Sequence, residues 1–156
     1  MQDDPSDKAR VIALPPLILT GVLVLGFVLD LARSAKFMPR AVALAIGILV
    51  ILGGIALALL AVRQMVRAKT AVDVRKPTTE IVTSGVFQFS RNPIYLSMVV
   101  LCLGAAFLLD SLWFLALCAP LAIVLQRRVI EPEEAYLEQK FGAKYLRYKA
   151  KVGRWL

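Results

Sequence analysis

Side chains that could take part in chemistry are concentrated in two polar stretches, residues 66–93 and 127–156, because the rest of the chain is largely apolar. The chain has no His and two Cys, which excludes most zinc sites and any catalysis by histidine. It offers no cage of carboxylates either, so we expect no metal site. Where a reaction needs a proton acceptor, the candidates are Tyr95, Glu133 and Glu134, unless the substrate ionises by itself. The surrounding elements must bring these groups together.

The composition indicates an integral membrane protein. The 156 residues are 59% hydrophobic and carry a formal net charge of +8. Soluble domains are about 45–50% apolar, and a chain this short cannot bury so much apolar surface in one core. The mean hydropathy of +0.71 agrees with this interpretation. The same figures exclude a disordered chain, a collagen-like repeat and a disulfide scaffold.

Four apolar runs are candidates for membrane segments: residues 11–30, 41–62, 94–109 and 111–130. The second run would be about 33 Å long as a helix, which spans the hydrocarbon core of a bilayer. The third would reach only about 24 Å, which is short for a full crossing. It meets the fourth run at Asp110-Ser111, so we expect these two runs to form a tight helical hairpin.

The expected fold is therefore an all-α integral membrane protein with four transmembrane segments and a C-terminal amphipathic helix. We expect one membrane domain over residues 1–156. It comprises an N-terminal tail (1–10), two transmembrane helices (11–62), a cytoplasmic loop (63–93), the hairpin (94–130) and a C-terminal cytoplasmic helix (131–156). The acidic start, residues 1–7, does not match a cleavable signal peptide.

Charge predicts the orientation. With four crossings, 16 of the 19 Lys and Arg lie on one side of the membrane, and Arg33, Lys36 and Arg40 lie on the other. The positive-inside rule then places both termini in the cytoplasm, and a bacterial inner membrane is the expected location. The basic residues suit contact with anionic lipid headgroups. Topology explains them without a nucleic-acid partner, so none is expected.

Local signals mark the ends of two helices near the polar stretches. Asn92-Pro93 predicts a helix start, with Asn as N-cap and Pro in the first turn. Pro132 with the acids after it predicts another start. Beyond it, an apolar stripe at helical spacing predicts an amphipathic helix that lies against the membrane or the hairpin, with Gly142 as a possible interruption. The stripe consists of Leu137, Phe141, Tyr145, Tyr148 and Val152.

Taken together, these features resemble the isoprenylcysteine carboxyl methyltransferase family and the related phospholipid methyltransferases. The resemblance covers residues 78–156, with order and spacing kept. The matching residues are Gly85-Val86-Phe87, Arg91-Asn92-Pro93-Ile94-Tyr95, Glu133-Glu134-Ala135-Tyr136-Leu137, Phe141-Gly142, Tyr145, Tyr148, Val152 and Arg154-Trp155. These families are integral membrane enzymes that use S-adenosylmethionine.

The resemblance implies a set of site residues. The cofactor contacts that it implies are Thr79, Glu80, Ile81, Val82, Phe87, Asn92, Pro93, Ile94, Tyr95 and Glu133. The catalytic candidates that it implies are Arg91, Asn92, Tyr95 and Glu134. The chain departs from the protein methyltransferases at Asn92, where they usually have His, and at Phe87, where they have Tyr. Their substrate-holding Arg falls on Val129, which argues against an isoprenylcysteine carboxylate as substrate.

The function expected from this resemblance is methyl transfer from S-adenosylmethionine to a lipid-soluble or membrane-delivered acceptor. That acceptor could be a carboxylate, an amine, a phenol or a thiol, and the sequence leaves the choice and the oligomeric state open. One alternative is an NADPH-dependent membrane reductase, since sterol reductases have a similar C-terminal layout. The other is a non-enzymatic four-helix membrane protein, either an assembly factor or a transporter. No charge lies mid-run in any segment, which argues against a proton-coupled transporter.

Overall fold

The computed structural model describes residues 14–73 and 77–156, and all regular elements in these two stretches are helical. In chain order they are α1 (Pro15–Ala32), α2 (Arg40–Arg67), a 3-10 turn η1 (Gly85–Gln88), α3 (Pro93–Leu108), α4 (Leu112–Leu125), a π-helical turn η2 (Gln126–Ile130), α5 (Glu131–Phe141) and α6 (Ala143–Lys149). The all-α prediction is confirmed over these residues.

Three helices are long and apolar enough to cross a membrane: Pro15–Ala32, Arg40–Arg67 and the continuous stretch Leu112–Phe141. The short α3 is apolar but has 16 residues, so a count of four crossings stays a prediction. Helix α2 runs to Arg67, beyond the predicted boundary at residue 62, because the residues that follow Val62 are good helix formers.

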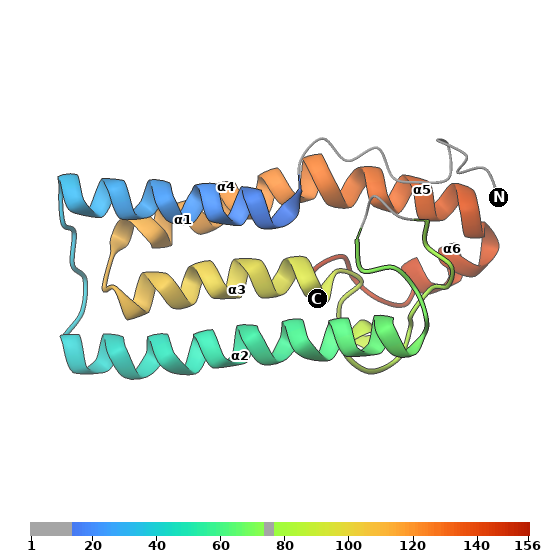
Figure 1. Cartoon of the computed structure of the whole chain (residues 1–156), viewed down its shortest axis with the longest axis horizontal. Helices are drawn as coiled ribbons and strands as arrows, with labels where there is room; N and C mark the ends of the chain where they lie inside the picture. The colour runs from blue at the N-terminus through green and yellow to red at the C-terminus, as the bar shows by residue number, and fades with distance from the viewer. Residues whose placement is uncertain (1–13, 74–76) are drawn as a thin grey trace.

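The helices lie side by side, with α2 beside α3 and α1 beside α4 (Figure 1). Glycines let α2 and α3 approach closely. A Cβ atom on Gly47 would overlap the backbone of Leu108, and one on Gly104 would lie 2.6 Å from Cγ1 of Ile51. Small residues have this role between membrane helices, where close backbone contact replaces the hydrophobic drive that lipid does not supply.

The connection between α1 and α2 lies at the same end of the bundle as the turn between α3 and α4 (Figure 1), and Asp110 joins the two. Its Oδ1 accepts hydrogen bonds from the backbone N–H groups of Phe37 (3.0 Å) and Met38 (3.1 Å), which lie between α1 and α2. Asp110 itself forms the turn between α3 and α4 at a φ of 49°, a conformation that Asp tolerates better than most residues. Lys36 Nζ adds a bond to the carbonyl of Leu109 (2.9 Å).

The predicted helix start at Pro132 is wrong. The helix that begins at Leu112 continues through η2 into α5 without a break. Pro132 lacks an N–H group, and its ring would clash with the carbonyl four residues earlier in a regular α-helix. The wider π turn at Gln126–Ile130 comes directly before this point, and such a turn makes room for the ring.

The sequence predicts that the C-terminal amphipathic stripe lies against the membrane or the hairpin, and the structure packs it against the loop after α2. Its aromatic members Tyr145 and Tyr148 form a core with Ile81 of the loop after α2, and the remaining stripe residues pack around it: Leu137, Phe141 and Val152. Gly142, at a φ of 49°, separates α5 from α6. This sharp turn folds the stripe back over the loop, and so the expected interruption at Gly142 is confirmed.

The close α2–α3 contact gives a test of the bundle. We expect Gly47→Ala to lower the free energy of unfolding by about 1–3 kcal/mol, the usual cost of overpacking, since the new methyl group meets the Leu108 backbone. Thermal unfolding in detergent measures the change. Gly53→Ala on the same helix is the matched control, because a Cβ atom there meets nothing within 4 Å. Equal stability of the two variants would contradict this packing.

Candidate active site

A polar pocket of about 60 Å³ lies where the loop after α2, the start of α3, and helices α5 and α6 meet. Its polar and charged lining residues come from segments far apart in the sequence. The full lining is Met65, Thr70, Thr78, Glu80, Ile81, Val82, Phe87, Arg91, Asn92, Glu133, Glu134, Leu137, Tyr145 and Tyr148. Both polar stretches of the sequence therefore contribute to one site.

Glu134 is the centre of the charge network in this pocket. Its side chain is 5% exposed and accepts two hydrogen bonds from Arg154, at 3.2 Å from Nε to Oε1 and 2.8 Å from Nη2 to Oε2. Arg91 Nη2 lies 3.2 Å from Oε1 of the same carboxylate. The bonds to Glu134 raise the pKa of the Arg154 guanidinium above its ordinary value. One buried carboxylate thus holds two guanidinium groups.

Arg91 has hydrogen-bonding capacity left over. Its side chain is 7% exposed, and its Nε and Nη1 atoms are buried without a hydrogen-bond partner among the described residues. Leaving a buried charged donor unpaired is costly, more so than for a neutral group. A ligand with a carboxylate or another anionic oxygen group could accept a hydrogen bond from one of these atoms.

The C-terminal segment positions the residues around Arg91. The Arg91 N–H donates to the carbonyl of Gly153 (3.0 Å), and Asn92 Nδ2 donates to the carbonyl of Arg154 (3.0 Å). Asn92 occupies the predicted N-cap position of α3, but its side chain makes no capping bond. The amide is bound to the C-terminal segment instead, so Asn92 fixes that segment against the start of α3.

The loop that covers the pocket is held by hydroxyl groups. Thr70 Oγ1 accepts from the N–H groups of Thr79 (3.2 Å) and Glu80 (3.4 Å). Tyr148 donates its hydroxyl proton to the carbonyl of Phe87 (2.6 Å), and burial raises the pKa of Tyr148 to about 12. Burial raises the pKa of Tyr145 as well. Both tyrosines therefore stay uncharged at neutral pH, and their rings face a site that also contains carboxylates.

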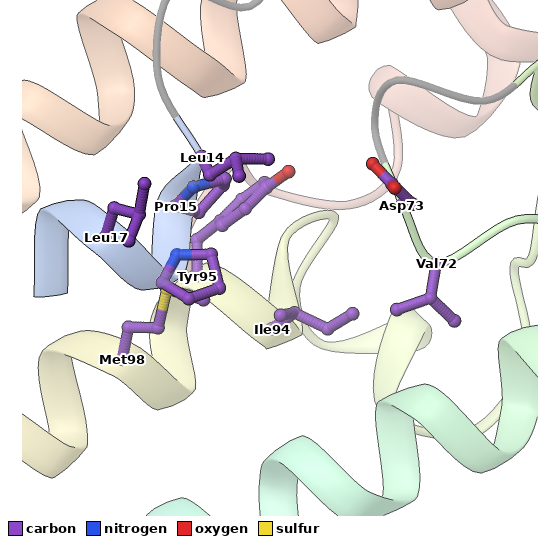
Figure 2. A pocket seen from close by; sticks show the side chains of 9 residues that line it. Leu14, Pro15, Leu17, Val72, Asp73, Ile94, Tyr95 and Met98 are labelled. Carbon is purple, nitrogen blue, oxygen red and sulfur yellow. The ribbon is translucent and has the colours of Figure 1, made fainter. Parts of the chain in front are cut away.

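Tyr95 connects the polar pocket to a second, apolar cavity. Its hydroxyl donates to Glu133 Oε2 at 2.6 Å, a length typical of a bond to an ionised carboxylate. Its side chain also lines a cavity of about 470 Å³ at the start of α1 and α3 (Figure 2). That cavity is lined by Leu14, Pro15, Pro16, Leu17, Val72, Asp73, Ile94, Tyr95 and Met98.

Most of the predicted site residues meet in these two cavities. Among the predicted cofactor contacts, those that line the polar pocket are Glu80, Ile81, Val82, Phe87, Asn92 and Glu133. The catalytic candidates Arg91 and Glu134 line the polar pocket too. The predicted cofactor contact Ile94 lines the apolar cavity, as does Tyr95, which belongs to both predicted sets. Thr79 and Pro93 are not among the residues that line either cavity. The Thr79 hydroxyl donates to the carbonyl of Lys69 (2.8 Å), and Pro93 is buried at the start of α3.

Several functional positions were not predicted. Tyr145 and Tyr148 belong to the matched motif and to the amphipathic stripe, but neither pattern gave them a role in the site, although their spacing indicated a shared face. Arg154 was part of the Arg-Trp motif but received no role. The residues of α1 in the apolar cavity carried no sequence signal, since Pro and Leu are common at the start of any membrane helix.

Comparisons with known proteins give a family and a relative for this chain. The family model described as phospholipid methyltransferase matches residues 42–144. An uncharacterized protein from Haemophilus influenzae is similar to this chain, with 41% identity over 64 residues that cover 40% of this chain and 100% of that protein. No solved structure matches.

The buried charge network gives a second test. We expect Glu134→Gln to destabilise the protein by about 3 kcal/mol, because it leaves the buried Arg91 guanidinium without an anion. Glu131→Gln is the matched control. Glu131 also lies near Arg154, at 3.6 Å, but its side chain is 36% exposed, so its loss has a small effect. Thermal unfolding in detergent compares the two, and similar melting temperatures would refute a central role for Glu134.

Proposed function

The chain belongs to the phospholipid methyltransferase family, and from that premise we propose that it transfers a methyl group from S-adenosylmethionine to a lipophilic acceptor within the membrane. The family implies a membrane methyltransferase, and the three apolar helices agree with a membrane protein. The observation that carries the choice of cofactor is the buried Arg91, with two donor atoms that lack a partner in the described part of the chain.

The residues of the polar pocket fit the chemistry of this cofactor. Arg91 would hold its carboxylate, and Glu80 would accept hydrogen bonds from its amino or ribose groups. The rings of Phe87, Tyr145 and Tyr148 would face its cationic part, as aromatic rings do around other organic cations. When bound, the cofactor supplies an activated methyl group on a sulfonium.

The pocket must open to admit a nucleoside cofactor. Its volume of about 60 Å³ is far below the roughly 300 Å³ at the lower end of ordinary ligand sites. The loop at residues 77–84 lies over this pocket, and its hydrogen bonds to Thr70 and Tyr136 would have to break for the pocket to open there. Closure of the loop over the bound cofactor would exclude water from the reaction.

The apolar cavity suits the hydrocarbon part of the acceptor. It lies between the starts of α1 and α3, and its lining is almost entirely apolar (Figure 2). Because α1 is one of the helices suited to span the membrane, an acceptor could enter this cavity from the lipid. Tyr95 would then position the polar head of the acceptor next to the cofactor pocket, which is the positioning that methyl transfer requires.

Arg91 provides the test of cofactor binding. We expect Arg91→Lys to weaken S-adenosylmethionine binding by about 10- to 100-fold, since it removes donors worth about 1.5–3 kcal/mol to a charged group while it keeps the positive charge next to Glu134. Calorimetry in nanodiscs measures the affinity, with NADPH as the comparison ligand. Arg147→Lys, at an exposed position of α6, should leave the affinity unchanged. Binding of NADPH alone would refute the proposal.

Met98 provides the test of the acceptor cavity. We expect Met98→Trp to fill part of the cavity and raise the KM for a long-chain acceptor at least tenfold, with the affinity for S-adenosylmethionine unchanged. Ile123→Trp is the control, because Ile123 is 60% exposed on the outside of α4 and does not line the cavity. Transfer of radiolabelled methyl groups to extracted lipid provides the assay. An unchanged KM would place the acceptor elsewhere.

A further inference from the structure

The two adjacent glutamates of α5 have different surroundings. Glu134 is bound by the guanidinium groups of Arg91 and Arg154, so both of its oxygens already accept hydrogen bonds or pair with a cation. Glu133 is bound instead by an uncharged group, the hydroxyl of Tyr95, at 2.6 Å. Among the interactions of the described residues, this is the one that Glu133 makes. Of the two carboxylates, Glu133 is therefore the one free to take up a proton.

Tyr95 stands between the two cavities. Its side chain is 6% exposed and lines the apolar cavity, whereas Glu133 lines the polar pocket. Asp73 is the carboxylate that lines the apolar cavity itself, and the Tyr95 hydroxyl links this cavity to a second carboxylate, Glu133 of the polar pocket. A hydroxyl can pass a proton on in one step, because it donates its own proton as it accepts another.

The apolar cavity also lacks a partner for an anionic acceptor. No Lys or Arg is among its described lining residues, and Asp73 is its charged member. Val129, which stands where the related protein methyltransferases have a substrate-holding Arg, is fully buried in the core with Tyr95. Arg127 is 70% exposed and lies near Glu131, so it does not replace that group. A carboxylate would enter this cavity unpaired, which is costly.

We propose that the acceptor is a neutral group with an acidic proton, a phenol or a thiol on a hydrocarbon chain, and that Tyr95 and Glu133 remove this proton during transfer. The inference rests on the proposed methyl transfer. The acceptor oxygen or sulfur bonds to the methyl carbon as the bond from that carbon to the cofactor sulfur breaks, and the sulfonium becomes a neutral thioether. The acceptor proton passes to the Tyr95 oxygen while the Tyr95 proton passes to Glu133 Oε2. One positive and one negative charge disappear together.

This balance of charge suits a buried site. The sulfonium cation and the Glu133 carboxylate are both present before the reaction and both neutral after it, so no new charge forms in the low-dielectric interior. The other titratable and charged groups around the pair neither gain nor lose a proton in this step. They are Asp73 beside Tyr95 in the apolar cavity, and Glu80, Arg91, Glu134, Tyr145 and Tyr148 in the polar pocket.

The test compares two phenols that carry the same alkyl chain, one ordinary and one made acidic by a nitro group. We expect Glu133→Gln and Tyr95→Phe to lower kcat for the ordinary phenol by about 100-fold or more, the usual contribution of a positioned base. The loss should be much smaller for the nitrophenol, which ionises without help. Glu138→Gln is the control, since Glu138 pairs with Lys149 and lines neither cavity.

Two binding measurements separate this inference from the proposed function. Calorimetry should give saturable S-adenosylmethionine binding by the wild type and the same affinity for Glu138→Gln, and Tyr95→Phe should weaken binding of the ordinary phenol to the cofactor-free protein by about fivefold, the value of one hydrogen bond. Absence of S-adenosylmethionine binding in the wild type would refute the proposed function itself. With that binding intact, the inference is overturned by equal losses for both phenols, by no loss, or by a wild type that methylates a long-chain carboxylate but neither a phenol nor a thiol.

Discussion

The ion pairs of Glu134 connect the three parts of the chain that form the site. Arg91 comes from the start of α3, Glu134 from α5 and Arg154 from the C-terminal segment. These parts lie far apart in sequence, and the apolar contacts between the helices would not by themselves fix their polar ends. Because a buried charge without a partner costs several kcal/mol, any displacement of one part from the other two is strongly opposed. The ion pairs of Glu134 therefore maintain the shape of the polar pocket and the position of the unpaired Arg91 donors.

Hydropathy was sufficient to predict the apolar helices α1 to α4, because an apolar run in a membrane must satisfy its backbone hydrogen bonds internally, and a helix does so. The break at Gly142 was also predictable, since glycine adopts the positive φ that the turn requires. The start of α3 at Pro93 followed from the Asn-Pro pair, although the Asn92 side chain is bound to the Arg154 carbonyl rather than to its own helix. A tertiary contact of that kind leaves no trace in local sequence.

The features that the sequence did not predict correctly also depend on contacts with distant parts of the chain. Pro132 looked like a helix start because a π turn cannot be recognised from residue types alone. The amphipathic stripe was expected to lie against the membrane or the hairpin, but the loop residue Ile81 packs on it, and loops give no periodic signal. The resemblance led to most of the residues of the polar pocket. The apolar cavity depends on how α1 packs beside α3, which residue types at the start of α1 did not reveal.

The π turn at Gln126–Ile130 has a consequence for the angular phase of the long helix. An α-helix rotates by about 100° per residue, and a π turn accommodates one extra residue without shifting the axis of the helix. All residues after it are therefore rotated relative to the apolar face of α4. This offset lets one helix present Leu121 and Leu125 to the core and, two turns later, Glu133 and Glu134 to a polar site. The same residues wound as an unbroken α-helix would direct both carboxylates to a different face, since each residue adds about 100° of rotation.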